Sequence, residues 1–340
     1  MADALRLAAS LLAAVAGGAV VGGMGAPAGW LSGAMLGVAA LAAGGGAAPL
    51  PRALQRFTVL LAGVGIGTGL TPATLPTLAR YPVSLVALAL ALALAIAAMT
   101  AASYFTLLRA RFTRTTAFYA AVPGALSYVF ITAARAEADL ARVAVIQVFR
   151  LFVLMAIVPM VARLGVGAPN LQFAADPLAV TAALLTLAAA AGAGLDRLGI
   201  ANGGLYAGIF ISATAHGAGL APGRLTPDLQ IAAQALVGPW VGARFIGFDW
   251  RLLRELLVAA TASFLAAFAV TTGFAALVAV MIGVPFPDAL AAFAPGGLEA
   301  MTMMAFGLGL DPLFVGAHHI ARFLMISLTL PWAARWLGAK

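Results

Sequence analysis

The chain has 340 residues, of which 64% are hydrophobic and only 9% are charged, and its mean hydropathy is +1.06. The polar residues are too few to cover the surface of a water-soluble globule of this length. The composition therefore predicts an integral membrane protein. The chain contains no cysteine, which excludes disulfides, thiol catalysis and thiolate metal sites. Its net charge of +8 fits arginines in cytoplasmic loops better than nucleic-acid binding.

Apolar runs of membrane-spanning length, separated by Gly, Pro and Arg, predict six elements in each half of the chain. In the first half they are Leu5 to Gly23, Trp30 to Gly44, Leu54 to Leu70, Val83 to Leu108, Thr115 to Ala134 and Leu140 to Ala162. In the second half they are Leu178 to Gly194, Gly203 to Leu220, Leu229 to Phe245, Leu252 to Gly283, Phe286 to Gly309 and Leu313 to Leu337.

The stretch from Pro295 to Pro331 repeats an earlier one, which lies 172 residues upstream and aligns without a gap over 37 positions. Pro123, Gly124, Leu126, Asp139, Val143, Arg150 and Pro159 pair with Pro295, Gly296, Leu298, Asp311, Val315, Arg322 and Pro331. Matches at Asp and Arg are rarely accidental in a chain with so few charges. The sequence therefore predicts an internal duplication, with repeats at residues 1–166 and 167–340.

The distribution of basic residues predicts how the elements cross. If all twelve crossed, the basic residues outside the membrane would divide 10 to 7 between the two faces. If the two Pro-Gly elements, at about 115–134 and 286–309, each enter and leave on the same side, the division becomes 14 to 3. The three basic residues on the outer face are then Arg80, Arg163 and Arg224. The positive-inside rule then predicts ten crossings, two re-entrant segments and cytoplasmic termini.

Five crossings in each half make the second half start on the opposite side of the membrane from the first. The predicted fold class is therefore an all-α integral membrane protein with two inverted repeats, each of about five transmembrane helices and one re-entrant or broken helix. Inverted repeats whose broken segments meet near the midplane are the architecture of secondary transporters. Non-helical backbone at that depth must be buried in protein or line a water-filled cavity.

The Pro-Gly motifs are the first candidate binding elements. Proline removes a backbone donor and glycine tolerates unusual dihedral angles, so each motif is expected to break its helix. The freed N–H groups and the positive end of the following half-helix can bind an anion or a polar group. A simple kink is the alternative, and the presence of two motifs at equivalent positions favours the binding role.

Arg150 and Arg322 are expected in the middle of their helices, where an arginine costs at least about 2.5 kcal/mol and must face a partner or an aqueous cavity. One interpretation is a bidentate clamp on a carboxylate or another oxyanion. The alternative is structural, with Arg322 paired to Glu299 and Arg150 bound to carbonyls of the broken helix. The sequence favours neither interpretation.

The carboxylates near the helix starts have a simpler expected role. Asp139 and Asp311 directly precede their helices, so we expect them to act as N-caps that also complement the helix dipole. Asp288 precedes the second Pro-Gly motif and is expected to mark a helix start.

The histidines belong to the second repeat. His318 and His319 are adjacent and point about 100° apart on a helix, so they cannot chelate one metal as an i, i+4 pair, and no metal site is expected. His319 stands where the first repeat has Gln147. A protonation relay between His319 and Glu299 is one interpretation, because buried imidazole and carboxyl groups titrate near neutrality. A histidine hydrogen-bonded to a neighbouring carbonyl is the alternative.

The candidate residues for binding a solute or an ion share a position at the breaks or on the helices that follow them. They are Pro123, Gly124, Ser127, Tyr128, Gln147, Arg150, Pro295, Gly296, Gly297, Glu299, His318, His319 and Arg322. No catalytic or metal-ligating residue and no cofactor is expected.

Several stretches together resemble the bacterial AbrB family of duplicated membrane proteins. They are Pro27 to Gly33 (PAGWLSG), the two Pro-Gly elements, and Ala317 to Arg322 (AHHIAR). The resemblance covers essentially the whole chain and implies an inner-membrane protein. Members are labelled as regulators of gene expression and some as ammonia monooxygenases. This chain has Ala125 where a second Gly is usual and Tyr128 where an acidic residue often follows, so any carboxylate at the site is expected from Glu299 alone.

These features bear on three classes of function. A secondary transporter of a small, anionic solute, coupled to H⁺ or Na⁺, accounts for the inverted repeats and the two arginines. A membrane-bound regulator acting through a partner follows from the family label, but direct nucleic-acid binding is not expected because the predicted loops leave no helix-turn-helix outside the bilayer. An enzyme such as an oxygenase lacks ligands, with three His and no Cys. The expected partners are the lipid bilayer, the solute and its coupling ion, and a homodimer is left open.

Overall fold

The computed structural model describes residues 2–26, 28–72, 82–124, 126–165, 174–199 and 203–336. Pro27, Arg80 and Ala125 lie outside these ranges. Within them the chain forms helices and no strand. A helix satisfies its backbone N–H and C=O groups within one segment, which suits a chain with few polar side chains.

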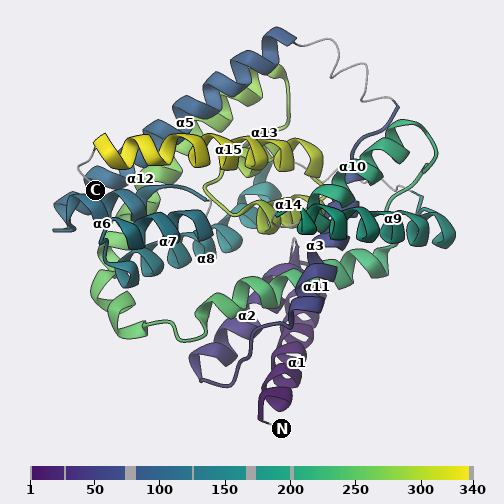
Figure 1. Cartoon of the computed structure of the whole chain (residues 1–340), viewed down its shortest axis with the longest axis horizontal. Coiled ribbons are helices and arrows are strands. Elements are labelled where there is room, and N and C mark those ends of the chain that lie inside the picture. The colour runs from purple at the N-terminus through teal and green to yellow at the C-terminus, as the bar shows by residue number, and fades with distance from the viewer. Residues whose placement is uncertain are drawn as a thin grey trace. The chain divides into compact units, whose positions relative to one another are not determined.

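The same order of helices occurs in both halves of the chain (Figure 1). The first half contains α1 (Ala2–Gly23), α2 (Gly29–Ala43), α3 (Arg52–Gly67), α5 (Pro82–Arg109), α6 (Arg114–Ala121), α7 (Leu126–Arg135) and α8 (Leu140–Gly165). The second half contains α9 (Leu178–Arg197), α10 (Gly203–Gly217), α11 (Pro227–Gly242), η1 (Ala243–Phe245), α12 (Trp250–Ile282), α13 (Phe286–Phe293), α14 (Leu298–Gly307) and α15 (Pro312–Trp336). The predicted elements are confirmed, and their ends differ from the observed ones by no more than three residues.

Of the helices described, six are long and apolar enough to cross a membrane: α1, α5, α8, α9, α12 and α15. Helices α2, α3, α10 and α11 have 15 or 16 residues, fewer than the roughly 20 that an upright span needs. The all-helical, membrane-type fold is therefore confirmed. The ten crossings and the inverted topology stay predictions.

The helices form two compact units that cut across the two halves of the chain. Unit 1 consists of Met1–Pro82, Ala162–Gly247 and Thr302–Leu313. Unit 2 consists of Val83–Val161, Phe248–Met301 and Phe314–Lys340. Each unit thus combines corresponding helices: α1 to α3 with α9 to α11 in unit 1, and α5 to α8 with α12, α13 and α15 in unit 2. Helix α14 is divided between the two units after Met301. The repeats at 1–166 and 167–340 stay a prediction, because a duplicated stretch of sequence need not be one compact body.

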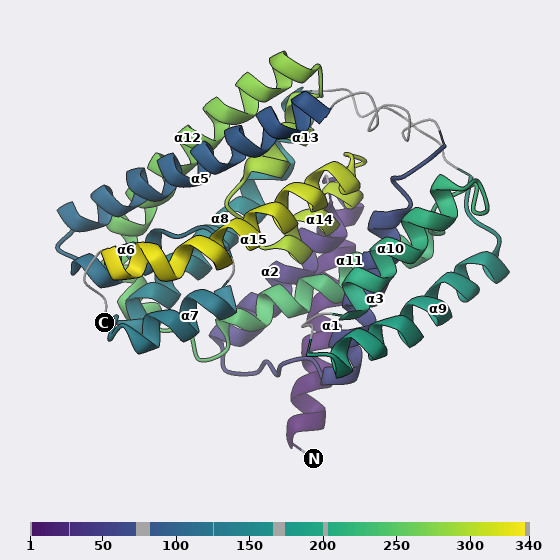
Figure 2. The ribbon, with the colours of Figure 1, turned by 45° about the horizontal axis from the view of Figure 1, so that its top comes forward.

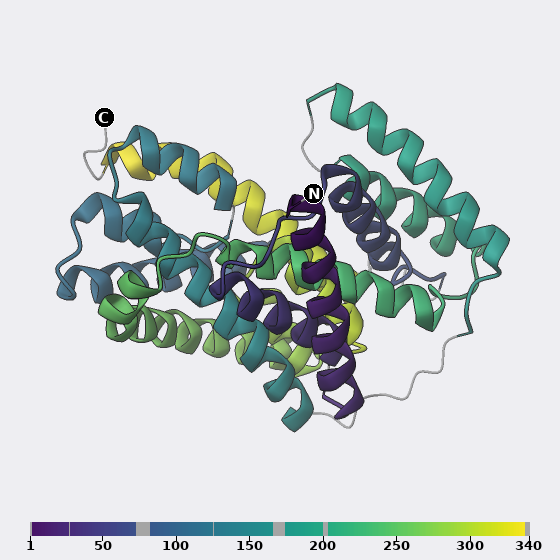
Figure 3. The ribbon, with the colours of Figure 1, turned by 90° about the horizontal axis from the view of Figure 1, so that it is seen from below.

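Unit 1 is built on helices that approach each other at glycines. A Cβ atom on Gly33 of α2 would lie 2.1 Å from the carbonyl oxygen of Gly17 in α1, the darkest helix in Figure 3. A Cβ atom on Gly63 of α3 would lie 2.3 Å from the carbonyl oxygen of Leu205 in α10, which lies beside α3 in Figure 2. Small residues let membrane helices pack backbone to backbone, so a larger residue at these positions would force the helices apart.

Unit 2 contains a long antiparallel pair, α5 and α12, which lie side by side in Figure 2. Ser103 Oγ and Ser263 Oγ form a buried hydrogen bond of 2.5 Å, and further along the pair Thr271 Oγ1 lies 4.0 Å from the sulfur of Met99. The contacts run in opposite directions along the two sequences, which shows that the helices are antiparallel. The broken helices α6 and α7 pack with α8 in the apolar core of this unit.

Candidate functional site

The chain breaks in both predicted places, within unit 2. Helix α6 ends at Ala121 and α7 begins at Leu126, while α13 ends at Phe293 and α14 begins at Leu298. Val122 and Ala294, the residues before the prolines, have ψ angles of 126° and 136°. This extended conformation is the one that a following proline favours, because its ring crowds the helical conformation of the preceding residue.

The first broken segment returns to its starting point. The backbone N–H of Asp139, just after α7, donates to Thr116 Oγ1 in the first turn of α6 at 3.1 Å. Thr113 caps α6 by accepting the N–H of Thr116 at 3.3 Å. The segment therefore forms a hairpin whose two ends are in contact, as a re-entrant segment requires.

The two breaks meet each other. Gly124 has a φ angle of +81°, a left-handed conformation that favours glycine. A Cβ atom built there would lie 3.5 Å from the carbonyl oxygen of Gly296 and 3.9 Å from Cδ of Arg322. In the second break the N–H of Gly296 donates to the carbonyl of Ala294 at 2.8 Å, which closes a tight turn around Pro295. The predicted convergence of the Pro-Gly motifs is thus present in unit 2.

Helix α8 supplies donors to the end of α6. Arg150 donates from Nη1 to the carbonyl of Ala121 at 3.2 Å and from Nη2 to that of Val122 at 3.0 Å, and Nη2 also contacts Gln147 Oε1. Gln147 Nε2 donates to the carbonyls of Tyr119 and Val122 at 3.0 and 2.8 Å. The last carbonyls of a helix have no partner within it, so these two side chains satisfy groups that would otherwise be buried and unbonded.

Helix α15 repeats this arrangement at the end of α13. Arg322 donates from Nη1 to the carbonyl of Ala294 and from Nη2 to that of Ala292 at 2.6 Å. His319 Nε2 lies 3.1 Å from the carbonyl oxygen of Ala291. The contact of His319 with Ala291 is equivalent to that of Gln147 with Tyr119, because His319 lies 172 positions after Gln147 and Ala291 lies 172 positions after Tyr119. The hydrogen bonds at the two breaks therefore repeat at the same offset as the sequence.

The geometry bears directly on the two interpretations of the arginines. The guanidinium group of Arg150 binds carbonyls of a broken helix, as the structural interpretation expects. That of Arg322 also binds carbonyls of a broken helix, whereas the same interpretation paired it with Glu299. The Nε atoms of both arginines are buried and have no hydrogen-bond partner among the described atoms. Both like charges also lie at the first break, because Arg150 bonds the carbonyl of Val122 and Cδ of Arg322 is 3.9 Å from the Cβ position of Gly124. Each arginine thus has a structural role and one unused donor.

His318 differs from its neighbour His319. Its Nδ1 lies 2.7 Å from the carbonyl oxygen of Phe314, and the rings of Phe293 and Phe314 lie 5.5 and 4.2 Å away from its own, between centroids. Its Nε2 is buried without a partner in the described structure. Because a carbonyl only accepts, Nδ1 carries the hydrogen and Nε2 has a free lone pair in the neutral ring.

The remaining predicted site residues are placed unevenly. Gly297 has open space around the position of a Cβ atom, and Tyr128 is half-buried in α7. The side chains of Ser127 and Glu299 lie outside the described part of the structure, so the predicted pairings of Glu299 with Arg322 and His319 stay predictions. Among the described residues, no group of three or more His, Asp or Glu side chains could ligate a metal.

The carboxylates at the helix starts act as expected. Asp139 Oδ1 accepts the N–H of Arg142 at 3.0 Å, and Asp311 Oδ1 accepts that of Leu313 at 2.9 Å, so both cap their helices. Burial lowers the pKa of the Arg224 guanidinium below its usual range, and the charge of Asp311 partly offsets this effect. Asp288 lies buried in the first turn of α13, which confirms the predicted helix start.

One polar pair in unit 1 was missed by the sequence reasoning. His216 Nε2 lies 2.9 Å from Asp176 Oδ2, and both side chains are buried. Asp176 Oδ1 accepts the N–H of Gly223 at 2.7 Å, and His216 Nδ1 lies 2.7 Å from the carbonyl oxygen of Ser212. The predicted topology could have indicated this pair, because it places the start of α9, next to Asp176, and the end of α10, with His216, on the same side of the membrane.

The helices and the two broken segments define an all-helical protein of the membrane type. The family described as "Transition state regulatory protein AbrB" matches residues 30–338, nearly the whole chain, and the chain therefore belongs to the AbrB family. The resemblance noted from the sequence is confirmed. No curated protein and no solved structure shows a significant match to the chain.

Proposed function

We propose that the protein is a secondary transporter of a small anionic solute, and that the solute binds beside the two breaks in unit 2. The observation that carries this proposal is the meeting of two interrupted helices, Gly124 against Gly296, inside a membrane-type helical core. The proposal includes no catalytic step. It places the protein in a bacterial inner membrane with both termini in the cytoplasm.

Two contacts support an inverted arrangement of the repeats. Met99 and Thr271 lie 172 residues apart, which is the offset of the repeated stretch, and they touch each other, as do Gly124 and Gly296. A residue meets its own equivalent only near a twofold axis. Because the equivalent helices α5 and α12 run antiparallel, that axis lies across the helices, as in inverted-topology transporters.

The breaks favour a polar solute because a helix begins at each of them. Helices α7 and α14 each begin at a break, where their first N–H groups have no partner within the helix. These ends carry the positive part of the helix dipole. In transporters of this type, half-helix N-termini point at anionic groups of the substrate.

The charge balance favours an anion. Arg150 and Arg322 are buried at 4% and 1% exposure, and neither forms an ion pair with a described carboxylate. Their Nη groups bind carbonyls at the negative ends of α6 and α13. An anion at the breaks would relieve the repulsion between the two guanidinium groups and provide an acceptor for an unused Nε–H.

For coupling, the geometry favours H⁺ through His318. Nε2 of His318 can accept a proton. The positive charge of Arg322, one helical turn away, makes protonation of this imidazole less favourable. An anion bound near Arg322 would reduce that effect, so the proton and the anion would bind together. Coupling to Na⁺ is the alternative, and ion gradients distinguish the two.

Reconstituted protein tests the solute class. Thermal stabilisation and uptake are measured with organic acids, amino acids and amines, in Arg322→Gln and in the exposed control Arg251→Gln. Glutamine at 322 can still donate to a helix carbonyl, as Gln147 does, so the fold has a replacement donor. We expect one or more organic acids to stabilise the wild type and the control but not Arg322→Gln. Stabilisation by amines alone, or an undiminished response of Arg322→Gln, would contradict the proposal.

A second pair of variants tests the coupling. His319→Gln introduces the residue that the first repeat has at this position, whereas His318→Gln removes the free imidazole nitrogen. Uptake driven by a proton gradient should survive in His319→Gln and disappear in His318→Gln. Uptake that follows only a Na⁺ gradient, or a loss confined to His319→Gln, would refute the role of His318.

A membrane-bound regulator that acts through a partner is the second candidate, and the description of the matched family favours it. It predicts that the phenotype of a deletion strain is restored by a variant lacking both buried arginines. The transporter predicts that such a variant restores nothing, although it is present in the membrane at the normal amount.

A further inference from the structure

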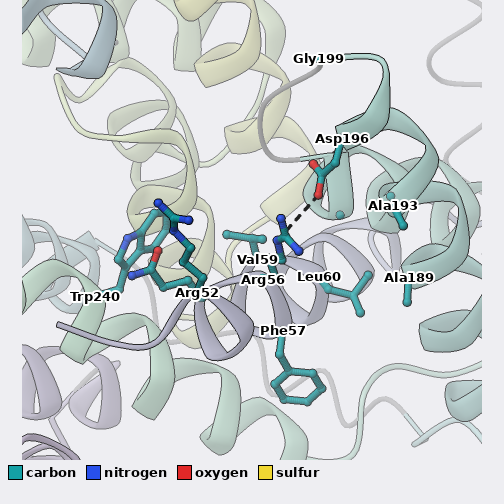
Figure 4. Close-up of a pocket in the computed structure, with 13 residues that line it drawn as sticks. Arg52, Arg56, Phe57, Val59, Leu60, Ala189, Ala193, Asp196, Gly199 and Trp240 are labelled. Carbon is teal, nitrogen blue, oxygen red and sulfur yellow. Dashed lines mark ion pairs between the residues drawn. The ribbon is translucent and has the colours of Figure 1, made fainter. Parts of the chain in front are cut away.

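A cavity of about 650 Å³ lies in unit 1, and its lining includes no residue of the breaks (Figure 4). It is formed by the start of α3, the end of α9, the beginning of α10 and the end of α11. Its lining includes Arg52, Arg56, Phe57, Ala193, Asp196 and Trp240. Ligand pockets in proteins typically occupy about 300 to 1,000 Å³, so the space suits a ligand of substantial size.

The polar side of the cavity has more positive than negative charge. Arg56 Nε is 3.9 Å from Asp196 Oδ2, at the long end of an ion pair, and 75% of the Arg56 side chain is exposed. Asp196 Oδ1 is occupied by the N–H of Gly203 at 3.0 Å. Arg52 lines the same cavity, so the lining contains two arginines and one carboxylate, which is already bonded.

The other side of the cavity is apolar and uses small residues. Ala189, Gly192 and Ala193 form the wall on α9, and Figure 4 shows the two alanines on the helix that bears Asp196. Phe57 is 42% exposed, and Trp240 is half-buried. Tryptophan is enriched where the membrane meets water, because its ring has both an apolar body and a polar N–H. The cavity lining is therefore amphipathic, because it combines two arginines and an aspartate with alanines, glycines and aromatic rings.

We propose that this cavity binds an anionic phospholipid, with the phosphate on Arg52 and Arg56 and part of an acyl chain along Ala189 and Ala193. The planar guanidinium group matches phosphate oxygens in a bidentate geometry. Basic pockets between helices on the cytoplasmic side bind anionic headgroups, and the predicted topology places both arginines on that side. The lipid site is independent of the solute site, which lies in unit 2.

Native mass spectrometry of the purified full chain, with phosphatidylglycerol or phosphatidylcholine added, tests the proposal. The charge is removed in Arg52→Gln with Arg56→Gln, and the space is filled in Ala193→Phe, which leaves the charges unchanged. Arg251→Gln, an exposed arginine in unit 2, is the matched control. Each arginine near an anionic surface raises the binding affinity about fivefold. The double variant should therefore bind phosphatidylglycerol about 30-fold more weakly.

The expected result is a preference for phosphatidylglycerol that both cavity variants reduce and the control does not. Equal binding of the two lipids, or unchanged binding in the double variant, would overturn the proposal. Glycerol 1-phosphate is added as a competitor without acyl chains. If it displaces the lipid at equal concentration, or if Ala193→Phe binds normally, the acyl chain does not use the cavity and the assignment to a lipid is wrong. None of these outcomes depends on transport by unit 2.

Discussion

Gly124→Ala is the sharpest test of the geometry at the breaks. Gly124 has φ of +81°, and a Cβ atom would meet Gly296 and Arg322 only at ordinary contact distances of 3.5 and 3.9 Å. Steric overlap is therefore absent, and the cost is the conformational one, about 1–2 kcal/mol for a residue with a Cβ in the left-handed region. Gly273→Ala is the matched control, because Gly273 lies inside α12 with nothing within 4 Å of a Cβ. There alanine should stabilise the helix by about 0.5–1 kcal/mol.

The two variants make the same chemical change in the same unit, and the reasoning predicts opposite signs. Unfolding of the detergent-solubilised protein is monitored during heating and during titration with a denaturing detergent. The free energies of unfolding of the two variants should differ by about 1.5–3 kcal/mol, the sum of the two effects. A Gly124→Ala variant as stable as the wild type would show that the first break does not need a left-handed residue. The described geometry of the break would then be wrong.

Three further predictions concern the supports of the site. Gln147→Leu leaves two buried carbonyls at the end of α6 without this donor and should destabilise the protein by about 1–3 kcal/mol in the same unfolding assay. Ser103→Ala and Ser263→Ala should each weaken unit 2, and a double-mutant cycle should give a coupling of about 0.6 kcal/mol, whereas additive effects would contradict the hydrogen bond. Because the chain has no cysteine, single cysteines at Arg114 and Arg135, which flank the first broken segment, can be labelled directly. An impermeant reagent should reach both from the same side of the membrane, and labelling from opposite sides would exclude re-entry.

The helix boundaries could be predicted from the sequence because local residues determine them. Pro123 and Pro295 interrupt their segments where the sequence places them, and Asp139 and Asp311 cap the helices that they precede. These are short-range effects, in which a side chain acts on backbone groups a few residues away. The positive-inside count extended the prediction to the hairpin of the first break, which the contact of Asp139 with Thr116 supports.

The partners of the polar side chains could not be predicted in the same way. The sequence placed Arg322 in a helix core but could not show that its donors bind the carbonyls of Ala292 and Ala294. That contact joins residues 28 to 30 positions apart and depends on how two helices pack. The pairing of His216 with Asp176 was missed for the same reason. No spacing pattern in the chain encodes such a contact.

The composition of the two units has a consequence for the origin of the protein. If the predicted duplication is right, a half-length ancestor would have lacked some helices of each unit, because each unit draws on helices from both halves of the chain. Such a chain could have completed its hydrophobic cores only by exchanging helices with a second molecule of itself. Fusion of the two genes would then have converted an intermolecular assembly into an intramolecular one and freed each copy to diverge, as glutamine and histidine have done at one equivalent position.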